Sequence, residues 1–295
     1  MDRGFRSLHP VILLLYYVIV ISGLMLYQHP VFLLTASLMI IFINLLFDRG
    51  EQLKKWRWPI ALMTVATLFF VPFFNRRGTI VAFYIGDYPV KLESVYLGIM
   101  TAFTLLCILM IFITFNQVVT PNKFVYLFHR VFPQWALLLL LSMRFVPLLQ
   151  RRLLEMKDVQ ELKGLSVHEG TLRQRIKNGV LLLQALITWS MEESIQTADS
   201  MTARGYGRKK RTKYNSYLMK KRDWMSLLYL SVGGFAILLG WWLGDGVLSL
   251  TPIVEQPALI GREWFYLTVW VVLIGFPIWT EGKEIIKWKY FQQTT

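Results

Sequence analysis

The segment "ADSMTARGYG", residues 198–207, places a charged side chain where it can dock on another protein. Arg204 stands between Ala203 and Gly205 at the end of a stretch with helical spacing. Glycine accepts the left-handed conformation that ends many helices, and a cation in the last turn interacts favourably with the helix dipole. The segment therefore predicts a helix that stops at Gly205 and presents a guanidinium beside its end.

A second segment, "QELKGL", repeats this pattern earlier in the chain. Leu162, Lys163 and Gly164 occupy the three corresponding positions. Lysine keeps the charge but lacks the planar fork with which arginine binds carbonyl and carboxylate groups, so we expect a weaker or geometrically different contact there. A basic residue before glycine also ends many helices that bind nothing. Two such ends in one module favour a shared docking role over that simpler interpretation.

The stretch before Arg204 is amphipathic. At 100° per residue, an apolar stripe falls within about 40° of Met191 on the helical wheel. Its other members are Ile187, Ile195, Ala198 and Thr202. Arg204 lies about 220° from Met191, outside this stripe. We therefore expect its side chain to face water or a partner rather than lipid.

The segment "FPQWALLLLLSMRFVPLL" begins like a membrane helix, and Arg144 alone interrupts its apolar part. An arginine at the centre of a bilayer costs several kcal/mol, so Arg144 should face protein, water or headgroups. Pro147 removes a backbone hydrogen bond and can kink the helix. A short interfacial helix with a snorkelling Arg144 explains the same pattern.

The elements that must position these side chains follow from composition. The 295 residues are 55% hydrophobic, and the apolar residues come in long uncharged blocks. A helix that spans a bilayer needs about 20 such residues, with about 17–25 tolerated. The blocks are Val11–Tyr27, His29–Phe47, Pro59–Asn75, Ser94–Asn122, Trp224–Gly244 and Trp264–Thr280. They predict an all-α polytopic membrane protein with about six transmembrane helices.

The distribution of charge divides the chain into three parts. Residues 1–118 hold about four spans, residues 119–223 form a charged module of long amphipathic helices, and residues 224–295 hold two spans and a tail. The net charge of +14 fits basic cytoplasmic loops rather than nucleic-acid binding. The basic run at 208–213 supports this orientation, with both termini in the cytoplasm, and only Arg76 and Arg77 oppose it.

Catalytic and metal-binding patterns are weak. His9, His29, His129 and His168 have no metal-ligand spacing, and we expect them to be solvated or interfacial. Cys107 lies alone in an apolar block and should pack as a small residue. The sequence thus predicts neither a metal nor a cofactor.

Two functional alternatives remain open at this stage. Glu192 and Glu193 resemble the paired glutamates of an intramembrane hydrolase, although the arginine expected four residues later is replaced by Thr197. A stand-alone secondary transporter is disfavoured because such proteins bury ionisable residues in their spans, and these spans hold almost none.

Four features together resemble the transmembrane T component of energy-coupling factor (ECF) transporters. They are "HP" at 9–10, "RFVPLL" at 144–149, the basic-glycine end at 163–164 and "ADSMTARGYG" at 198–207. The resemblance implies a non-catalytic subunit of an ABC-type importer in a prokaryotic plasma membrane. It also implies a cytoplasmic-face module of coupling helices.

The same resemblance implies two kinds of protein partner besides the bilayer. Two ABC-type ATPase subunits would receive Arg204 and Lys163 in grooves, and a membrane S component would bind a vitamin, a related micronutrient or a metal ion. The chain itself has no G-x-x-x-x-G-K-[ST] phosphate-binding loop, so ATP hydrolysis would belong to the partner chains.

Overall fold

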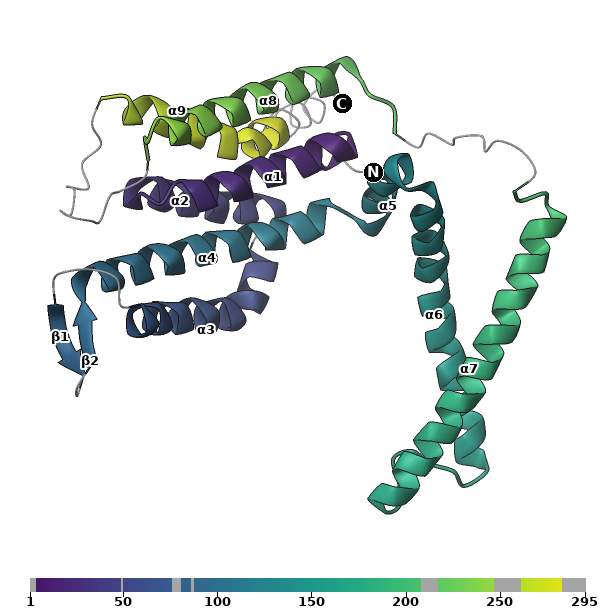
Figure 1. The fold of residues 1–295 in the computed structure, drawn as a ribbon. Coiled ribbons are helices and arrows are strands. Elements are labelled where there is room, and N and C mark those ends of the chain that lie inside the picture. Colours follow the sequence, from purple (N-terminus) through teal and green to yellow (C-terminus); the bar gives the residue numbers. More distant parts are fainter. Residues whose placement is uncertain are drawn as a thin grey trace, which may run out of the picture. The chain divides into compact units, whose positions relative to one another are not determined.

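The computed structural model describes residues 4–48, 50–75, 81–85, 88–207, 217–246 and 261–282 (Figure 1). The chain divides into two compact units, which are described separately. Met1–Phe124 and Tyr217–Thr295 form one, here called the bundle unit, and Val125–Ser216 form the other, here called the α6–α7 unit. The basic run 208–213 and the arginines at 76 and 77 lie outside the described residues.

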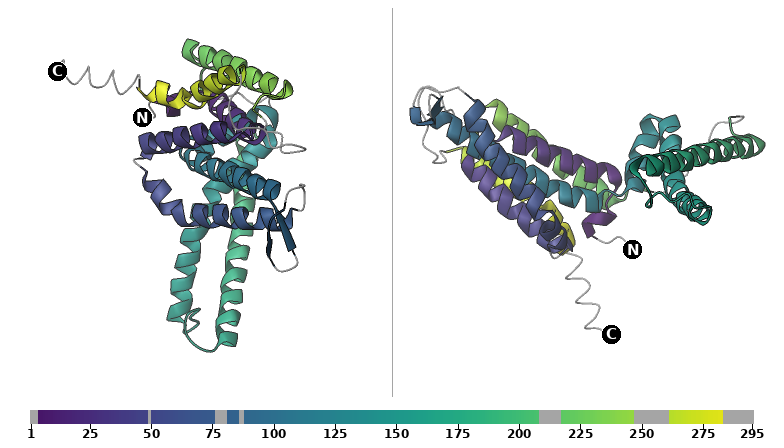
Figure 2. Two further views of the ribbon diagram at one scale, coloured as in Figure 1. Left: turned by 90° about the vertical axis from the view of Figure 1, so that its left-hand side faces the viewer. Right: turned by 90° about the horizontal axis from the view of Figure 1, so that it is seen from below.

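The bundle unit is built from apolar helices that lie side by side (Figure 2). Helix α1 contacts α4 and α8, α2 contacts α4 and α9, and α3 packs on α4. Its helical elements are η1 (Gly4–Ser7), α1 (Pro10–Leu26), α2 (Pro30–Asp48), α3 (Glu51–Phe74), α4 (Leu92–Val118), α8 (Lys221–Trp242) and α9 (Glu263–Ile274). A two-stranded antiparallel hairpin, β1 (Val81–Ile85) and β2 (Tyr88–Lys91), precedes α4 and was not predicted from the sequence.

These helices confirm an all-α polytopic membrane fold. Helices α2, α3, α4 and α8 are each long and apolar enough to cross a membrane. Helix α9 forms a further candidate span with Phe276–Gly282, from which it is bent by 45°. Helix α1 is apolar but has only 17 residues, at the short end of the length that spans a bilayer. The larger part of every uncharged block of the sequence therefore lies on one of these apolar helices.

A histidine caps the N-terminus of two of these helices. The backbone N–H of Val11 donates to Nδ1 of His9 at 3.3 Å, and that of Val31 donates to Nδ1 of His29 at 3.3 Å. His9 and His29 are 6% and 3% exposed, so of the two expected settings, solvated or interfacial, the solvated one does not hold for them. Burial lowers the pKa of His29, although Glu263 acts against this shift. The lowered pKa favours the neutral ring, which leaves Nδ1 free to accept the N–H.

Aromatic side chains connect the helices of the bundle unit by hydrogen bonds and close packing. The Tyr16 hydroxyl donates to the carbonyl of Ile274 at 2.9 Å, and the Tyr27 hydroxyl donates to that of Ile237 at 2.8 Å. Trp270 is 1% exposed and lies against Gly23 of α1, where a Cβ atom would overlap its ring. Gly23 is therefore required by close packing between α1 and α9.

We expect Gly23→Ala to destabilise the bundle unit by about 1–3 kcal/mol, because the added methyl group overpacks the core against Trp270. Gly179, in the middle of a helix of the other unit, has open space around it. Gly179→Ala is the matched control and should leave stability equal or higher, since alanine is the better helix former. Thermal unfolding of both variants in detergent measures the difference. Equal stability of the two variants would contradict the packing argument.

The α6–α7 unit contains two long helices that contact each other (Figure 1). They are α6 (Pro133–Leu162) and α7 (Leu172–Ala203). The shorter helix α5 (Pro121–Val131) begins in the bundle unit and continues into this one. Helices α6 and α7 are both long enough to cross a membrane, but neither is among the described helices that are also apolar enough to do so.

Candidate functional site

Helix α7 ends in a closed turn around Arg204. The N–H of Tyr206 donates to the carbonyl of Met201 at 3.0 Å, and the N–H of Gly205 donates to that of Thr202 at 2.9 Å. Arg204 retains near-helical angles, whereas Gly205 has φ of 79°. These two hydrogen bonds and the left-handed glycine define a Schellman motif. Arg204 is therefore the last residue that follows the helix path.

Helix α6 ends in the same way around Lys163. The N–H of Leu165 donates to the carbonyl of Gln160 at 2.9 Å, and the N–H of Gly164 donates to that of Glu161 at 3.0 Å. Gly164 has φ of 74°. The two basic-glycine segments therefore share one backbone geometry, with the cation at the helix cap and glycine directly after it.

Both helix ends present their cations to solvent. Lys163 and Arg204 are exposed, and Leu162 beside Lys163 is 89% exposed. A Cβ atom at Gly164 or Gly205 would meet nothing within 4 Å, so the positive φ alone calls for glycine at these positions. Space around each cation is therefore open to a second protein within the described part of the chain.

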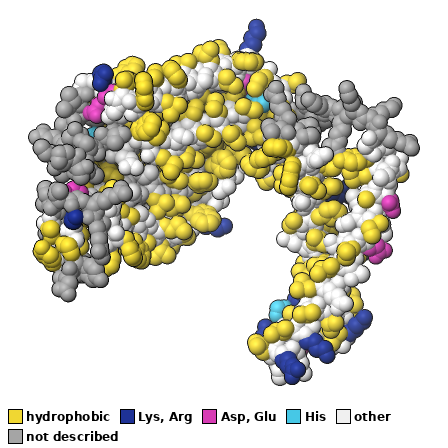
Figure 3. Space-filling view, in the orientation of Figure 1, with side chains coloured by type: hydrophobic (Ala, Val, Ile, Leu, Met, Phe, Trp, Pro, Cys, Tyr) yellow, Lys and Arg dark blue, Asp and Glu magenta, His cyan; other side chains and the backbone are white. Residues whose placement is uncertain are grey.

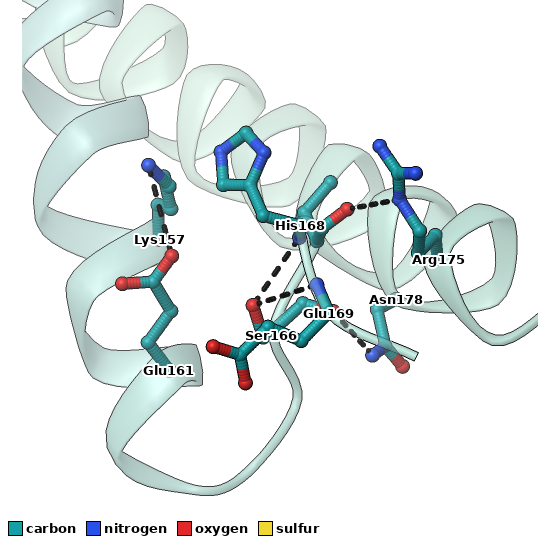
Figure 4. A network of polar contacts seen from close by, with 8 residues as sticks. Lys157, Glu161, Ser166, His168, Glu169, Arg175 and Asn178 are labelled. Atoms are coloured by element: carbon teal, nitrogen blue, oxygen red, sulfur yellow. Dashed lines mark hydrogen bonds and ion pairs between the residues drawn. The ribbon is translucent and has the colours of Figure 1, made fainter. Parts of the chain in front are cut away.

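The turn that follows Lys163 is held against α7 (Figure 4). The Asn178 side chain donates to the carbonyl of Ser166 at 2.9 Å, and Nε of Arg175 donates to that of Val167 at 3.0 Å. The Ser166 hydroxyl oxygen in turn accepts the N–H of His168 at 3.2 Å. Lys163 thus projects from a braced turn, not from a loose loop.

Side-chain contacts also join the bodies of α6 and α7. The guanidinium of Arg152 lies 5.0 Å from the ring centre of Trp189, and Leu182 is buried. The ion pair between Lys157 and Glu161, at 3.6 Å, lies within the last turns of α6 and stabilises that helix alone. The contacts between the two helices allow them to move as one body.

The face of α7 that α6 does not cover is apolar. Ile187, Met191 and Ile195 are 59%, 65% and 63% exposed. The stripe predicted from Met191 is therefore exposed to solvent, while α7 packs on α6 through another face. Spacings of three and four residues extend the stripe toward the N-terminus of α7 through Leu172, Ile176, Val180 and Leu183, all of them exposed. This extension was not predicted from the sequence.

Basic side chains gather near the end where α6 and α7 are joined (Figure 3). Arg173, Arg175 and Lys177 on the first turns of α7 are exposed there. This end of the unit, which carries Lys163, also holds Glu161 and Glu169, so charges of both signs lie there. Arg204 follows a stretch of α7 that contains Glu192, Glu193 and Asp199.

The remaining candidate residues lie apart from these ends. Arg144 is exposed on α6, which continues through Pro147 as one helix. Glu192 is exposed and Glu193 half-buried on α7. Among the described residues, no cluster of three or more His, Cys, Asp or Glu side chains could hold a metal ion. Cys107 is buried, and its thiol faces the carbonyl of Leu33.

Fold and site together define a polytopic α-helical membrane protein with two exposed cationic helix ends in a separate unit. The CbiQ family, described as cobalt transport protein, matches residues 3–214, and the chain belongs to this family. This membership confirms the resemblance to ECF T components that the sequence motifs carry.

Curated relatives agree with the family assignment. The chain is similar to the energy-coupling factor transporter transmembrane protein EcfT of Streptococcus thermophilus, with 27% identity over 76% of this chain and 88% of that protein. The protein of the same name from Macrococcus caseolyticus is 29% identical over 58% of this chain and 69% of its own length. That from Lacticaseibacillus paracasei is 35% identical, but the match covers only 36% of this chain and 38% of the relative.

We expect Gly205→Ala to loosen the end of α7, because alanine at this positive φ costs about 1 kcal/mol. Hydrogen exchange at the Tyr206 amide should then become faster, since its hydrogen bond to Met201 depends on the turn. Gly205→Asn should have a smaller effect, because asparagine tolerates the left-handed region. Unchanged exchange in the alanine variant would contradict the role assigned to the glycine.

Proposed function

We propose that this chain is the transmembrane coupling subunit of an ECF-type ABC importer. The observation that carries the proposal is the pair of Schellman turns, at 160–165 and 201–206, that present Lys163 and Arg204 in the same geometry. Two equivalent exposed cations at helix ends, here called pegs, suit a motor made of two related subunits. The names of the relatives supply the transport context, and the chain's own sequence has no phosphate-binding loop.

The mechanism follows from the stiffness of α6 and α7. At 1.5 Å per residue, α7 with 32 residues is about 48 Å long. ATP binding would bring the two ATPase subunits together and carry the helix ends at Lys163 and Arg204 with them. Because α6 and α7 contact each other, their displacement would tilt the exposed apolar stripe of α7 as one surface.

A membrane S component would rest on that stripe. An apolar row such as Ile187, Met191 and Ile195 binds a partner surface because contact removes it from water. Tilting of the stripe would then reorient the S component and its bound vitamin, related micronutrient or metal ion. In this proposal the chain itself is non-catalytic, lies in a prokaryotic plasma membrane and has both termini in the cytoplasm.

The two pegs should differ in strength. Arginine offers a planar fork that matches carboxylate and carbonyl groups, whereas the lysine ammonium is a point charge on a flexible stem. Arg204 is therefore expected to contribute more to ATPase binding than Lys163.

The first test reverses the charge at Arg204. Arg204→Glu should weaken copurification of the ATPase subunits at least about a hundredfold, because a like charge replaces an attractive contact at the interface. Arg151→Glu, at an exposed position on α6 far from both helix ends, is the control and should retain the ATPases. Lys163→Glu should show a smaller or similar loss. A normal yield of the complex with Arg204→Glu, while the variant inserts normally, would refute the proposal.

The second test separates the two partner surfaces. Replacement of Ile187, Met191 and Ile195 by serine should lose the S component, at least about tenfold in affinity, because most of the apolar contact is removed. ATPase copurification should be unaffected. Thr188→Ala, on a neighbouring exposed position, is the control. Pull-down of both partners from detergent measures the outcome, and loss of the ATPases with the S component retained would contradict the assignment of the surfaces.

A further inference from the structure

The N-terminal segment Gly4–His9 is anchored in the core of the bundle unit. Phe5 and Leu8 are 0% and 1% exposed. The ring of Phe5 packs against aromatic side chains from helices far apart in the sequence, namely Tyr16, Tyr17, Phe47 and Phe276. A segment held by so many aromatic contacts is a structural element in its own right.

Two cations hold the backbone of this segment, and they come from the two places where the chain passes between the units. Lys123 lies just before the chain leaves the bundle unit at Phe124, and Arg222 follows its return at Tyr217. The ammonium of Lys123, 3% exposed, donates to the carbonyl of Arg6 at 2.7 Å. The guanidinium of Arg222 donates to the carbonyl of Gly4 at 2.8 Å.

Further contacts strengthen both attachments inside the bundle unit. Lys123 also donates to the carbonyl of Val118, the last residue of α4, at 3.1 Å. The ring of Tyr217 meets that of His9 edge-on, with ring centres 6.5 Å apart. Hydrogen bonds to charged groups are about twice as strong as neutral ones, and removal of a buried one leaves its partner unsatisfied. Both crossing points are therefore firmly joined to one short segment.

Gly4 completes the arrangement. Its φ is 66°, and an added Cβ atom would overlap the carboxylate of Glu281. That carboxylate accepts the N–H of Phe5 at 3.2 Å. The path of the segment thus depends on glycine, both for its backbone angle and for the close approach of Glu281.

We propose that Gly4–His9 is a clasp that holds, within the bundle unit, the two places where the chain leaves for the α6–α7 unit and returns from it, and that this hold supports energy coupling. The inference rests on the proposed function, since it concerns how a displacement of α6 and α7 is converted into work. With both crossing points held, force applied at the helix ends rotates the unit about a fixed base. With the clasp open, the same force moves the base, and less of the displacement reaches the S component. Lys123 and Arg222 are positioning residues in this scheme.

The first experiment uses the full chain alone in detergent or nanodiscs. Spin labels at Ser231 on α8 and Ser200 on α7, in a Cys107→Ser background, report the distance between the two units. Lys123→Met combined with Arg222→Met should broaden the distance distribution about twofold, because two charge-assisted hydrogen bonds to the clasp are lost. Lys221→Met, an exposed cation beside Arg222, is the control and should leave it unchanged. An unchanged distance distribution in the double variant would overturn the clasp proposal, and this result does not depend on whether the ATPase subunits bind.

The second experiment uses the assembled transporter. The double variant should still copurify the ATPase subunits and hydrolyse ATP, but substrate taken up per ATP hydrolysed should fall about tenfold, because force is dissipated at the base of the unit. A fall in uptake that only follows a fall in assembly would reduce the clasp to a stability element and overturn the proposal. If the unaltered chain bound no ATPase, the proposed function would fail, and the label distances would still decide on the clasp.

Discussion

The last side chain of a helix is accessible to a partner only if the chain turns away immediately after it. This constraint governs the α6–α7 unit. At both ends the left-handed glycine closes the backbone on itself, so the terminal carbonyls are satisfied without any side chain. The cation that precedes the glycine is left exposed, because the turn requires nothing of it. The orientation of each peg is thus set by backbone geometry, and its chemistry by the choice of lysine or arginine.

The two units of the chain solve different physical problems. The bundle unit buries large aromatic side chains, and the hydroxyl groups of Tyr16 and Tyr27 donate to helix carbonyls. In the absence of water, close packing and internal hydrogen bonds are what hold membrane helices together. The α6–α7 unit buries little on its own, and Leu162, Met191 and Ile195 remain exposed. Such a surface is typical of a protein that completes its packing in an assembly.

Sequence patterns predicted the elements that depend on local chemistry. Apolar block length located the membrane helices, and the glycines at 164 and 205 located the two helix ends. The hairpin before α4 was missed, since it is short and interrupts no apolar block. His9 and His29 were expected to be solvated or interfacial, and their role as helix caps was not predicted, because a histidine cap depends on side-chain orientation and burial. The clasp was beyond sequence reasoning: Lys123 and Arg6 are 117 positions apart, and only the packed bundle brings them together.

The account depends most on where the side chain at position 204 lies in the assembled transporter. A photo-crosslinking amino acid at 204, compared with one at the exposed position 151 in the body of α6, measures this directly when the complex is irradiated in membranes. The account predicts an adduct between position 204 and an ATPase subunit. Adducts of 204 only with lipid or with its own chain would contradict it.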